Sequence, residues 1–525
     1  MTQDCEALRW SRRKFFSTAT VAAASLATQF AAPCHAWSEA AAMPVVQLDA
    51  GLVRGLKAEE LLVFKGIPFA EPPIGELRFR PPQPVKPWTS VREAVACADP
   101  AMQPSHSTRE SEDCLYLNVV APNGGGPYPV FVWIHGGGFV AGSACDPGAE
   151  GSHFAVDGIV CVNVAYRLGV FGFLDLAPLL GQEYAGSANN GMRDVIAALA
   201  WVQRNIAAFG GDPAQVTVGG ESAGAKLTDL LLGVPAARPL FHQAISESGG
   251  ADRIWPQHRA YAVANAFGSL WKKQSGRSYR SLLTAPAEDL ITTGVAFYQN
   301  PPMHFPLRCE IDRTLIPRSP LEAIRSGSAR GKRLLIGTNL DESALFLGPN
   351  PQIDPGPRQL GNLSLTQFDR VAAHYAQLYP HATPALRRIL AATAEEYWVP
   401  SVRVAEASVM AGGTTYVYRF DQLHQSGKYK ALSPHTWELA YVWNRAGNLP
   451  REEQELAQFV HGLWVEFLKG SPMLLRQGPE SLQQDMAWPV YNLKTRPTLL
   501  LKAKPEIAEN PSGAELRLWN GLLEE

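Results

Sequence analysis

A serine between glycines is the first feature of this chain that could do chemistry. The residues GESAG at 220–224 follow a short apolar run at 216–218 and precede a helical stretch that starts at Ala225. This strand-turn-helix setting is typical of a nucleophile elbow, a turn so tight that small residues flank the serine and lift its hydroxyl above the sheet. The helix N-terminus behind the serine favours negative charge that develops there. The pattern therefore predicts Ser222 as the nucleophile of an acyl transfer.

The serine also requires a base and an acid. A serine hydroxyl is a weak nucleophile, so it needs a histidine that takes its proton and a carboxylate that orients this histidine. After a nucleophile elbow, the acid and then the base follow in the chain. Asp341 and Glu342 come soon after an apolar strand at 333–337, and His424 and His435 come later. Residue type and spacing leave both choices open.

A run of glycines upstream could supply hydrogen-bond donors for the oxyanion of the intermediate. The residues HGGGF at 135–139 follow an apolar strand at 130–134. Glycines there let backbone N–H groups approach a substrate without side chains in the way. A phosphate-binding loop is the alternative, but such a loop requires a Lys-Ser/Thr pair after the glycines, and none follows. The run therefore predicts an oxyanion hole.

The elements that must position these residues alternate between strands and helices. Near-continuous apolar runs at 115–120, 130–134 and 159–164 are typical of strands buried on both faces. Between residues 194 and 209, apolar residues recur at three- and four-residue steps, which indicates a helix. The alternation predicts an α/β fold with a large, mainly parallel central sheet, helices on both faces and long insertions.

Length and composition narrow the class of protein. The 525 residues are 46% hydrophobic and 18% charged, as expected of a globular chain, and the net charge of -2 provides no field that would attract nucleic acid. After the first forty residues, no stretch approaches the roughly 20 apolar residues of a membrane span. No linker or internal repeat marks a boundary, so residues 37–525 are expected to form a single domain.

The N-terminus has the order of an export signal. Two arginines and Phe-Phe occur within residues 11–16, a modestly apolar stretch follows at 17–32, and the small-x-Ala site of a signal peptidase ends at Ala36. Paired arginines in this position resemble the twin-arginine signal, which directs folded proteins out of the cytoplasm. We therefore expect residues 1–36 to be removed, and the mature protein to be periplasmic or secreted.

Together these residues resemble the type-B carboxylesterases, the group that includes bacterial para-nitrobenzyl esterases and the cholinesterases. The matching segments, in chain order, are residues 64–70, 77–79, 112–119, 135–139, 205–206, 209–213 and 220–224. The resemblance implies an α/β-hydrolase fold and a serine esterase that forms an acyl-enzyme from a small-molecule ester, with no metal or organic cofactor. It leaves acyl and alcohol preference and oligomeric state open.

The resemblance also implies roles for individual residues. It selects Glu342 as the acid and His435 as the base. The oxyanion donors that it implies are the backbone N–H groups of Gly137, Gly138 and Ala223. A secondary polar network is implied at Glu221, Ser248 and Glu438. Cys97 and Cys114 match the first disulfide of the family, which would close the loop 98–113 and stabilise the fold by about 3 kcal/mol.

Two departures from the family concern substrate specificity. Lys226 replaces a small residue one turn after the nucleophile, where its charge is expected to reach solvent or, alternatively, to contact an anionic acyl group. The loop 98–113 contains no aromatic residue, so choline specificity is not expected.

Two alternatives to ester hydrolysis stay open. The same triad could serve an amidase or a thioesterase, because it can attack either bond. This fold also hosts binding proteins that have lost catalysis. Those proteins usually lack a member of the triad, whereas here every candidate is present.

Overall fold

The computed structural model describes residues 43–104, 109–299, 305–350, 365–445, 447, 449–475 and 486–523. The predicted signal, residues 1–36, lies outside them. Among the described residues, no helix combines the length and the apolar character that crossing a membrane requires.

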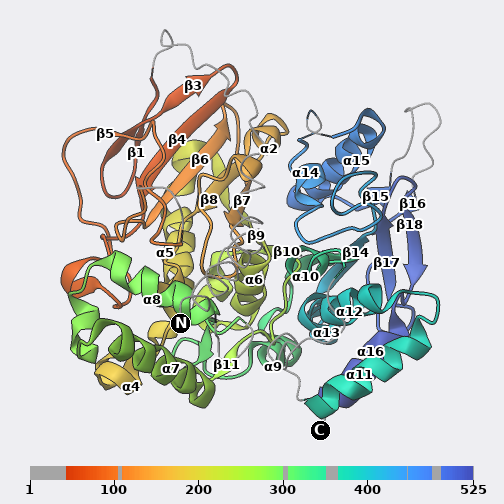
Figure 1. Ribbon diagram of the computed structural model, residues 1–525. Coiled ribbons are helices and arrows are strands. Elements are labelled where there is room, and N and C mark those ends of the chain that lie inside the picture. The colour runs from red at the N-terminus through yellow and green to blue at the C-terminus, as the bar shows by residue number, and fades with distance from the viewer. Residues whose placement is uncertain are drawn as a thin grey trace.

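One large sheet runs through the molecule (Figure 1). Among the described residues it has eleven strands, in the order β18-β17-β14-β13-β10-β9-β7-β8-β6-β4-β3. Their bounds are β3 (Leu56–Ala58), β4 (Leu61–Pro68), β6 (Tyr116–Pro122), β7 (Tyr128–Ile134), β8 (Val160–Val164), β9 (Gly211–Glu221), β10 (Gln243–Glu247), β13 (Arg333–Asn339), β14 (Thr414–Phe420), β17 (Pro497–Leu501) and β18 (Glu506–Glu509). The seven strands from β17 to β8 in this order are parallel to one another, and antiparallel strands complete the sheet, β18 at one edge and β6, β4 and β3 at the other. The predicted mainly parallel sheet is confirmed.

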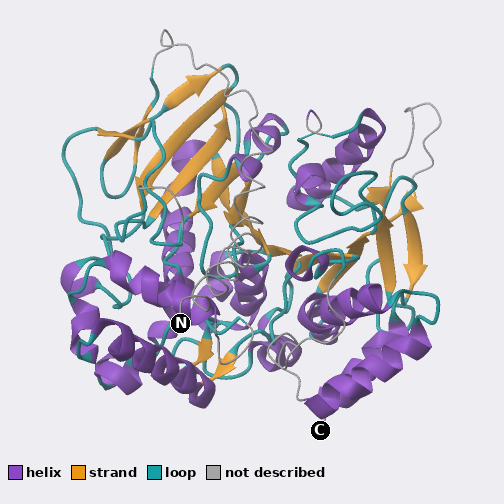
Figure 2. Ribbon diagram, viewed as in Figure 1, coloured by secondary structure: helices purple, strands orange, loops and turns teal. Residues whose placement is uncertain are grey.

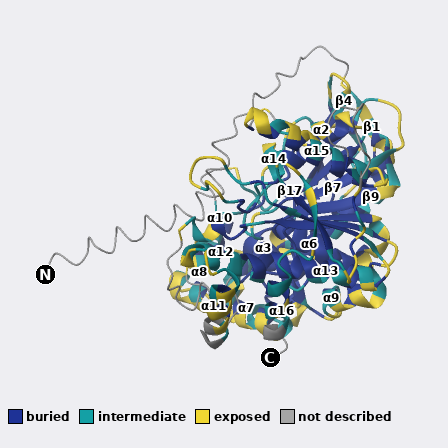
Figure 3. Cartoon of the chain, turned by 90° about the vertical axis from the view of Figure 1, so that its right-hand side faces the viewer, coloured by how far each residue is buried: buried dark blue, intermediate teal, exposed yellow. Residues whose placement is uncertain are grey.

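The central strands are buried on both faces, as their apolar runs predict. Val132 of β7 belongs to the same apolar cluster as Leu199 of helix α5 (Asn190–Asn205). Its neighbour Phe131 points to the opposite face and belongs to a second cluster with Trp464 of helix α15 (Arg451–Leu468). Figure 2 shows helices on both sides of the sheet, and Figure 3 shows the buried interior between them.

Long insertions between strands account for much of the chain. Helices α7 (Gln257–Ser275) and α8 (Ala287–Gln299) lie between β10 and β13 in sequence. Helices α11 (Leu365–Leu378), α12 (Pro384–Thr393) and α13 (Val399–Met410) lie between β13 and β14. These segments matter for the site because they carry side chains toward the ends of the parallel strands.

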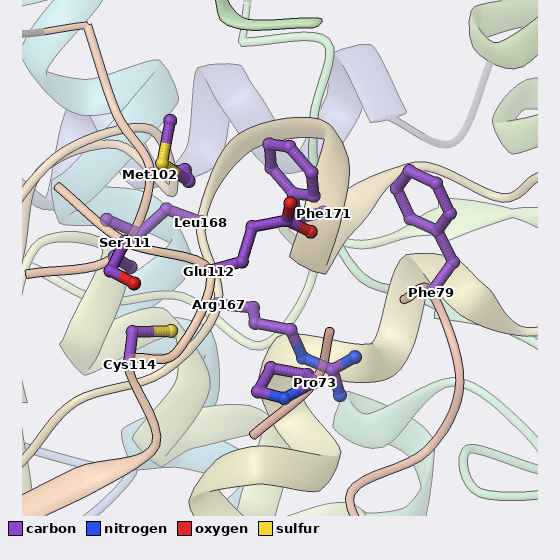
Figure 4. A pocket seen from close by; sticks show the side chains of 10 residues that line it. Pro73, Phe79, Met102, Ser111, Glu112, Cys114, Arg167, Leu168 and Phe171 are labelled. Atoms are coloured by element: carbon purple, nitrogen blue, oxygen red, sulfur yellow. The ribbon is translucent and has the colours of Figure 1, made fainter. Parts of the chain in front are cut away.

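The disulfide differs from the predicted one. Cys97 is bonded to Cys145, with their Cα atoms 6.2 Å apart, and Cys114 is free. The predicted Cys97–Cys114 pair is therefore wrong. The reason is the environment of Cys114, which is buried in the apolar core at the start of β6 and lines a small cavity with Ala101 and Met102 (Figure 4). Cys145 comes six residues after the glycine run, so its approach to Cys97 depends on the path of the chain after that run.

Candidate active site

Ser222 lies in a strained turn between a strand and a helix. Strand β9 ends at Glu221, helix α6 (Ala223–Gly233) follows, and Ser222 has φ 55° and ψ -117°. A side chain at Gly220 or Gly224 would place its Cβ 2.4 Å or 1.9 Å from the carbonyl oxygen of Ile134. Glycine is required at both positions because β7 packs directly against the turn. The turn therefore has the geometry expected of a nucleophile elbow.

The predicted acid and base meet at the ends of neighbouring loops. His435 Nδ1 is hydrogen-bonded to Glu342 Oε2. The other oxygen of Glu342 accepts hydrogen bonds from Ser248 Oγ at 2.5 Å and from the backbone N–H of Asn339 at 2.7 Å. All four residues are buried. Glu342 is thus fixed by two donors with one oxygen facing the imidazole.

The competing acid and base lie elsewhere. The Asp341 carboxylate accepts a hydrogen bond from the Ser433 backbone N–H at 2.9 Å, and burial raises the pKa of Asp341 to about 6. The His424 ring stacks on Trp437 with centroids 3.5 Å apart, and burial lowers the pKa of His424 to about 4. The structure therefore brings together Glu342 and His435 and leaves Asp341 and His424 in structural contacts.

The second nitrogen of His435 faces another carboxylate. His435 Nε2 lies 3.0 Å from Glu221 Oε1, and among the described residues no hydrogen bond joins it to Ser222 Oγ. Burial lowers the pKa of His435, but the charges of Glu221 and Glu342 outweigh burial and raise this pKa to about 10. The site favours the imidazolium form, which is the form that acyl transfer produces on the base.

Two further buried carboxyl groups surround this pair. Glu438 accepts a hydrogen bond from the Asn339 side chain, and burial together with neighbouring carboxylates raises the pKa of Glu438. Glu247 pairs in register with Glu221 on the adjacent strand and accepts a hydrogen bond from Trp464 Nε1 at 2.8 Å. Burial raises the pKa of Glu247 to about 8. Asn339 and Glu247 were not predicted from the sequence, although each is the last residue of a strand, and this position was a usable signal.

The glycine run lies against the elbow. A Cβ on Gly136 would lie 3.3 Å from Ser222 Cβ. Gly137 has φ 108°, and a Cβ there would lie 2.0 Å from the carbonyl oxygen of Ala141, so the turn admits only glycine. The predicted oxyanion donors, Gly137, Gly138 and Ala223, all lie in this turn or at the start of α6.

Aromatic rings form a wall between the base and the glycine run. The Tyr397 and Phe346 rings lie 4.8 Å and 5.2 Å from the His435 ring. Phe305 is 5.9 Å from Phe346, and its ring would be 3.8 Å from a Cβ on Gly138. These three aromatic residues were not predicted, because they come from insertions whose paths the local sequence does not specify.

Lys226 is buried, and its expected exposure to solvent is wrong. Its backbone N–H donates to the carbonyl oxygen of Ser222 at 2.9 Å, so both residues share one face of α6. The ammonium lies 3.2 Å from Glu396 Oε1 and 4.6 Å from the centre of the Tyr397 ring. Burial lowers the pKa of Lys226, and the charge of Glu396 opposes this shift. Contact with an anionic acyl group stays a prediction.

A small cavity lies outside this constellation. Its volume is about 10 Å³, room for about one water molecule, and none of the predicted catalytic residues lines it (Figure 4). The residues that line it are Pro73, Phe79, Ala101, Met102, Ser111, Glu112, Cys114, Arg167, Leu168 and Phe171.

Within the described part of the chain, no group of three or more His, Cys, Asp or Glu side chains could hold a metal ion.

Comparisons with known proteins show which family the chain belongs to. Residues 42–519 match the family model described as the carboxylesterase family. The para-nitrobenzyl esterase of Bacillus subtilis is 35% identical over 490 residues, which cover 89% of this chain and 96% of the relative. The liver carboxylesterase of Sus scrofa is 32% identical over 545 residues, which cover 92% and 94%.

Solved structures give the same result. A carboxylesterase of Geobacillus stearothermophilus superposes with a TM-score of 0.78 at 34% identity, over 90% of this chain and 99% of its own. A para-nitrobenzyl esterase also gives a TM-score of 0.78, at 33% identity over 91% and 100%. The chain therefore belongs to the carboxylesterase family, has the α/β-hydrolase fold and is a carboxylesterase.

Proposed function

We propose that this carboxylesterase hydrolyses small-molecule esters through a Ser222, His435 and Glu342 triad. Ser222 Oγ attacks the ester carbonyl while His435 Nε2 takes the serine proton, and the same nitrogen then returns it to the leaving alcohol. Water, activated by His435, attacks the acyl-enzyme and releases the acid. The hydrogen bond between His435 Nδ1 and the doubly anchored Glu342 is the observation that carries the proposal.

The oxyanion of each intermediate would be held by backbone donors. We assign the N–H groups of Gly137, Gly138 and Ala223 to this role, because the glycine turn packs against the elbow. For the proton transfer, Nε2 must exchange its contact with Glu221 for one with Ser222, the next residue. Hydrogen bonds between a catalytic base and its nucleophile are often long or poorly aligned before substrate binds.

A fluorophosphonate probe tests this mechanism. We expect the probe to label one residue per chain, Ser222, because only a serine activated by a base attacks phosphorus rapidly. Labelling should disappear in Ser222→Ala and persist in Ser269→Ala, a control at an exposed serine. Absence of labelling in the native protein would favour the alternative of a non-catalytic binding protein. Comparing ester, amide and thioester substrates with one acyl group separates the esterase from an amidase or thioesterase.

The pH dependence of activity should report the charges around His435. Since Glu221 and Glu342 raise the pKa of His435 to about 10, the neutral base becomes available as pH rises, and kcat/KM should increase through this range. Removing one charge in Glu221→Gln should move the acidic limb of the kcat/KM profile down by about 1–3 pH units. An unchanged limb would show that Glu221 does not influence the base.

We also propose that Lys226 contacts an anionic acyl group. The Glu396 carboxylate that pairs with Lys226 lies 3.5 Å from both Arg253 and Arg308, so three cations share it. We expect Lys226→Met to lower kcat/KM for p-nitrophenyl hemisuccinate about tenfold relative to p-nitrophenyl butyrate, the scale of one lost charged hydrogen bond. Lys272→Met is the control, because that ammonium also lies over a tyrosine ring. Equal selectivity in both variants would contradict the contact.

Export to the periplasm or medium is a further proposal, which rests on residues 11–36 alone. A mature N-terminus near residue 37 is the expected result, and one near Met1 would contradict it.

A further inference from the structure

One glutamine pairs with the chain that returns from the glycine turn. Gln103 Oε1 accepts a hydrogen bond from the Gly142 backbone N–H at 2.9 Å, and Gln103 Nε2 donates to the Gly142 carbonyl oxygen at 2.9 Å. The same Nε2 donates to the carbonyl oxygen of Ala101 at 3.1 Å. The side-chain amide therefore satisfies both backbone groups of Gly142, as a neighbouring strand would.

Two other contacts hold the next residues of this return segment. Asn118 Nδ2 donates to the carbonyl oxygen of Ala144 at 2.9 Å, and its Oδ1 accepts from the Gly66 backbone N–H at 2.9 Å. The disulfide joins Cys145 to Cys97, six residues before Gln103. Gly142, Ala144 and Cys145 are thus each attached to strand β6 or to the chain segment that precedes it.

Gly142 in turn packs on the residues that lead into the oxyanion turn. A Cβ on Gly142 would lie 2.2 Å from His135 Nδ1 and 2.5 Å from the Gly136 carbonyl oxygen. Gly137 is bound to the same segment, because its carbonyl oxygen accepts from the Ala141 N–H at 3.0 Å. A displacement of Gly142 therefore reaches Gly137 through their chain neighbours, because Gly142 packs on Gly136 and the residue before it, Ala141, is hydrogen-bonded to Gly137.

We infer that Gln103 is a positioning residue for the oxyanion hole. Its two hydrogen bonds to Gly142 fix the return segment and hold the Gly137 and Gly138 N–H groups where the oxyanion forms. This role rests on the proposed function, since it presumes that these donors bind the intermediate. Gln103 touches neither substrate nor reacting atoms and acts through backbone position.

The substitution Gln103→Leu tests this role, because leucine keeps much of the volume and removes both hydrogen bonds to Gly142, together with the one to Ala101. We expect kcat for p-nitrophenyl butyrate to fall about ten- to a hundredfold, since a misplacement of about 1 Å can cost on the order of 10². KM should stay within about twofold, because the oxyanion exists only after attack. Gln83→Leu is the matched control, since Gln83 Nε2 also donates to a carbonyl two residues earlier, at 3.1 Å, on the surface.

A trifluoromethyl ketone separates positioning from loss of folded protein. This inhibitor forms a tetrahedral adduct with the serine and places its oxygen in the hole, so its Ki should rise by the same factor as kcat falls. Unfolding would lower the active fraction, measured by fluorophosphonate titration, without changing Ki. Unchanged kcat and Ki in folded Gln103→Leu would overturn the inference. Absence of hydrolysis by the native protein would overturn the proposed function instead.

A variant without the Cys97–Cys145 disulfide provides a second comparison for Gln103→Leu. Cys97→Ser/Cys145→Ser removes the disulfide but keeps the pairing of Gln103 with Gly142, so its melting temperature should fall while Ki changes less than in Gln103→Leu. If the double variant raised Ki equally, general loosening of the segment would explain both results, and the specific role of Gln103 would be wrong.

Discussion

Replacing Ser222 by alanine should lower kcat for p-nitrophenyl butyrate on the order of 10⁶-fold, the cost of losing the nucleophile of a serine triad. Alanine keeps the Cβ, so the positive φ of the turn imposes the same strain on both side chains. The hydrogen bond between His435 and Glu342 does not involve the serine and should persist. Initial rates at saturating ester measure the loss, and circular dichroism checks the fold.

The surface variant Ser269→Ala controls for loss of a serine hydroxyl, since Ser269 Oγ only donates to the carbonyl oxygen of Asn265 in its own helix. Its kcat should match that of the native protein. If Ser222→Ala kept more than about one thousandth of native turnover, contaminating esterase would first have to be excluded by inhibitor titration. If the variant still retained this turnover once contamination had been excluded, the result would contradict a nucleophilic role for Ser222.

Replacing Glu342 by glutamine should lower kcat about 10⁴-fold, the loss seen when the acid of a serine triad becomes an amide. The carboxylate accepts the Nδ1–H of His435, keeps Nε2 free to accept the serine proton and stabilises the imidazolium. A glutamine can turn its NH₂ group toward Nδ1, which favours the wrong tautomer. KM should change little, because the loss falls on the chemical step.

The neighbouring carboxylate offers a matched control. Asp341→Asn changes the same functional group one residue away, and the asparagine oxygen can still accept the hydrogen bond from Ser433. We expect its kcat to stay within about threefold of the native value, the range of small changes remote from the reacting atoms. Equal losses in both variants would show that general disruption of the loop, rather than the Glu342 contact, lowers activity.

Patterns of residue type along the sequence predicted the central strands, the serine turn and helix α5, because each of these elements depends on residues that are close together in the chain. Strands β7 and β8 were readable because residues buried on both faces are apolar without alternation. The elbow was readable because Gly220 and Gly224 are forced by the carbonyl of Ile134, and such steric demands leave few residue choices. Helix α5 was expected from 194 to 209, whereas it runs from Asn190 to Asn205, an ordinary difference at helix ends.

Contacts between distant segments could not be read in the same way. Nothing in the local sequence distinguishes His435 from His424, because the distinction lies in which ring reaches Glu342. The pairing of Cys97 with Cys145 likewise depends on how the chain after the glycine turn returns to the segment before β6. Lys226 was expected in water because lysine is rarely buried without a partner, and its partner Glu396 lies 170 residues away in an insertion.

The order of the strands has a consequence for synthesis of the chain on the ribosome. The half of the sheet from β3 to β10 is complete at residue 247, but the strand that covers the open edge of β10, β13, begins only at residue 333. At a translation rate of roughly 5–20 residues per second, the edge of β10 stays unpaired for about 4–17 s before synthesis of β13 begins. An open edge can pair with other chains. A nascent chain therefore carries its serine on an unfinished sheet and acquires its histidine only near the end of translation.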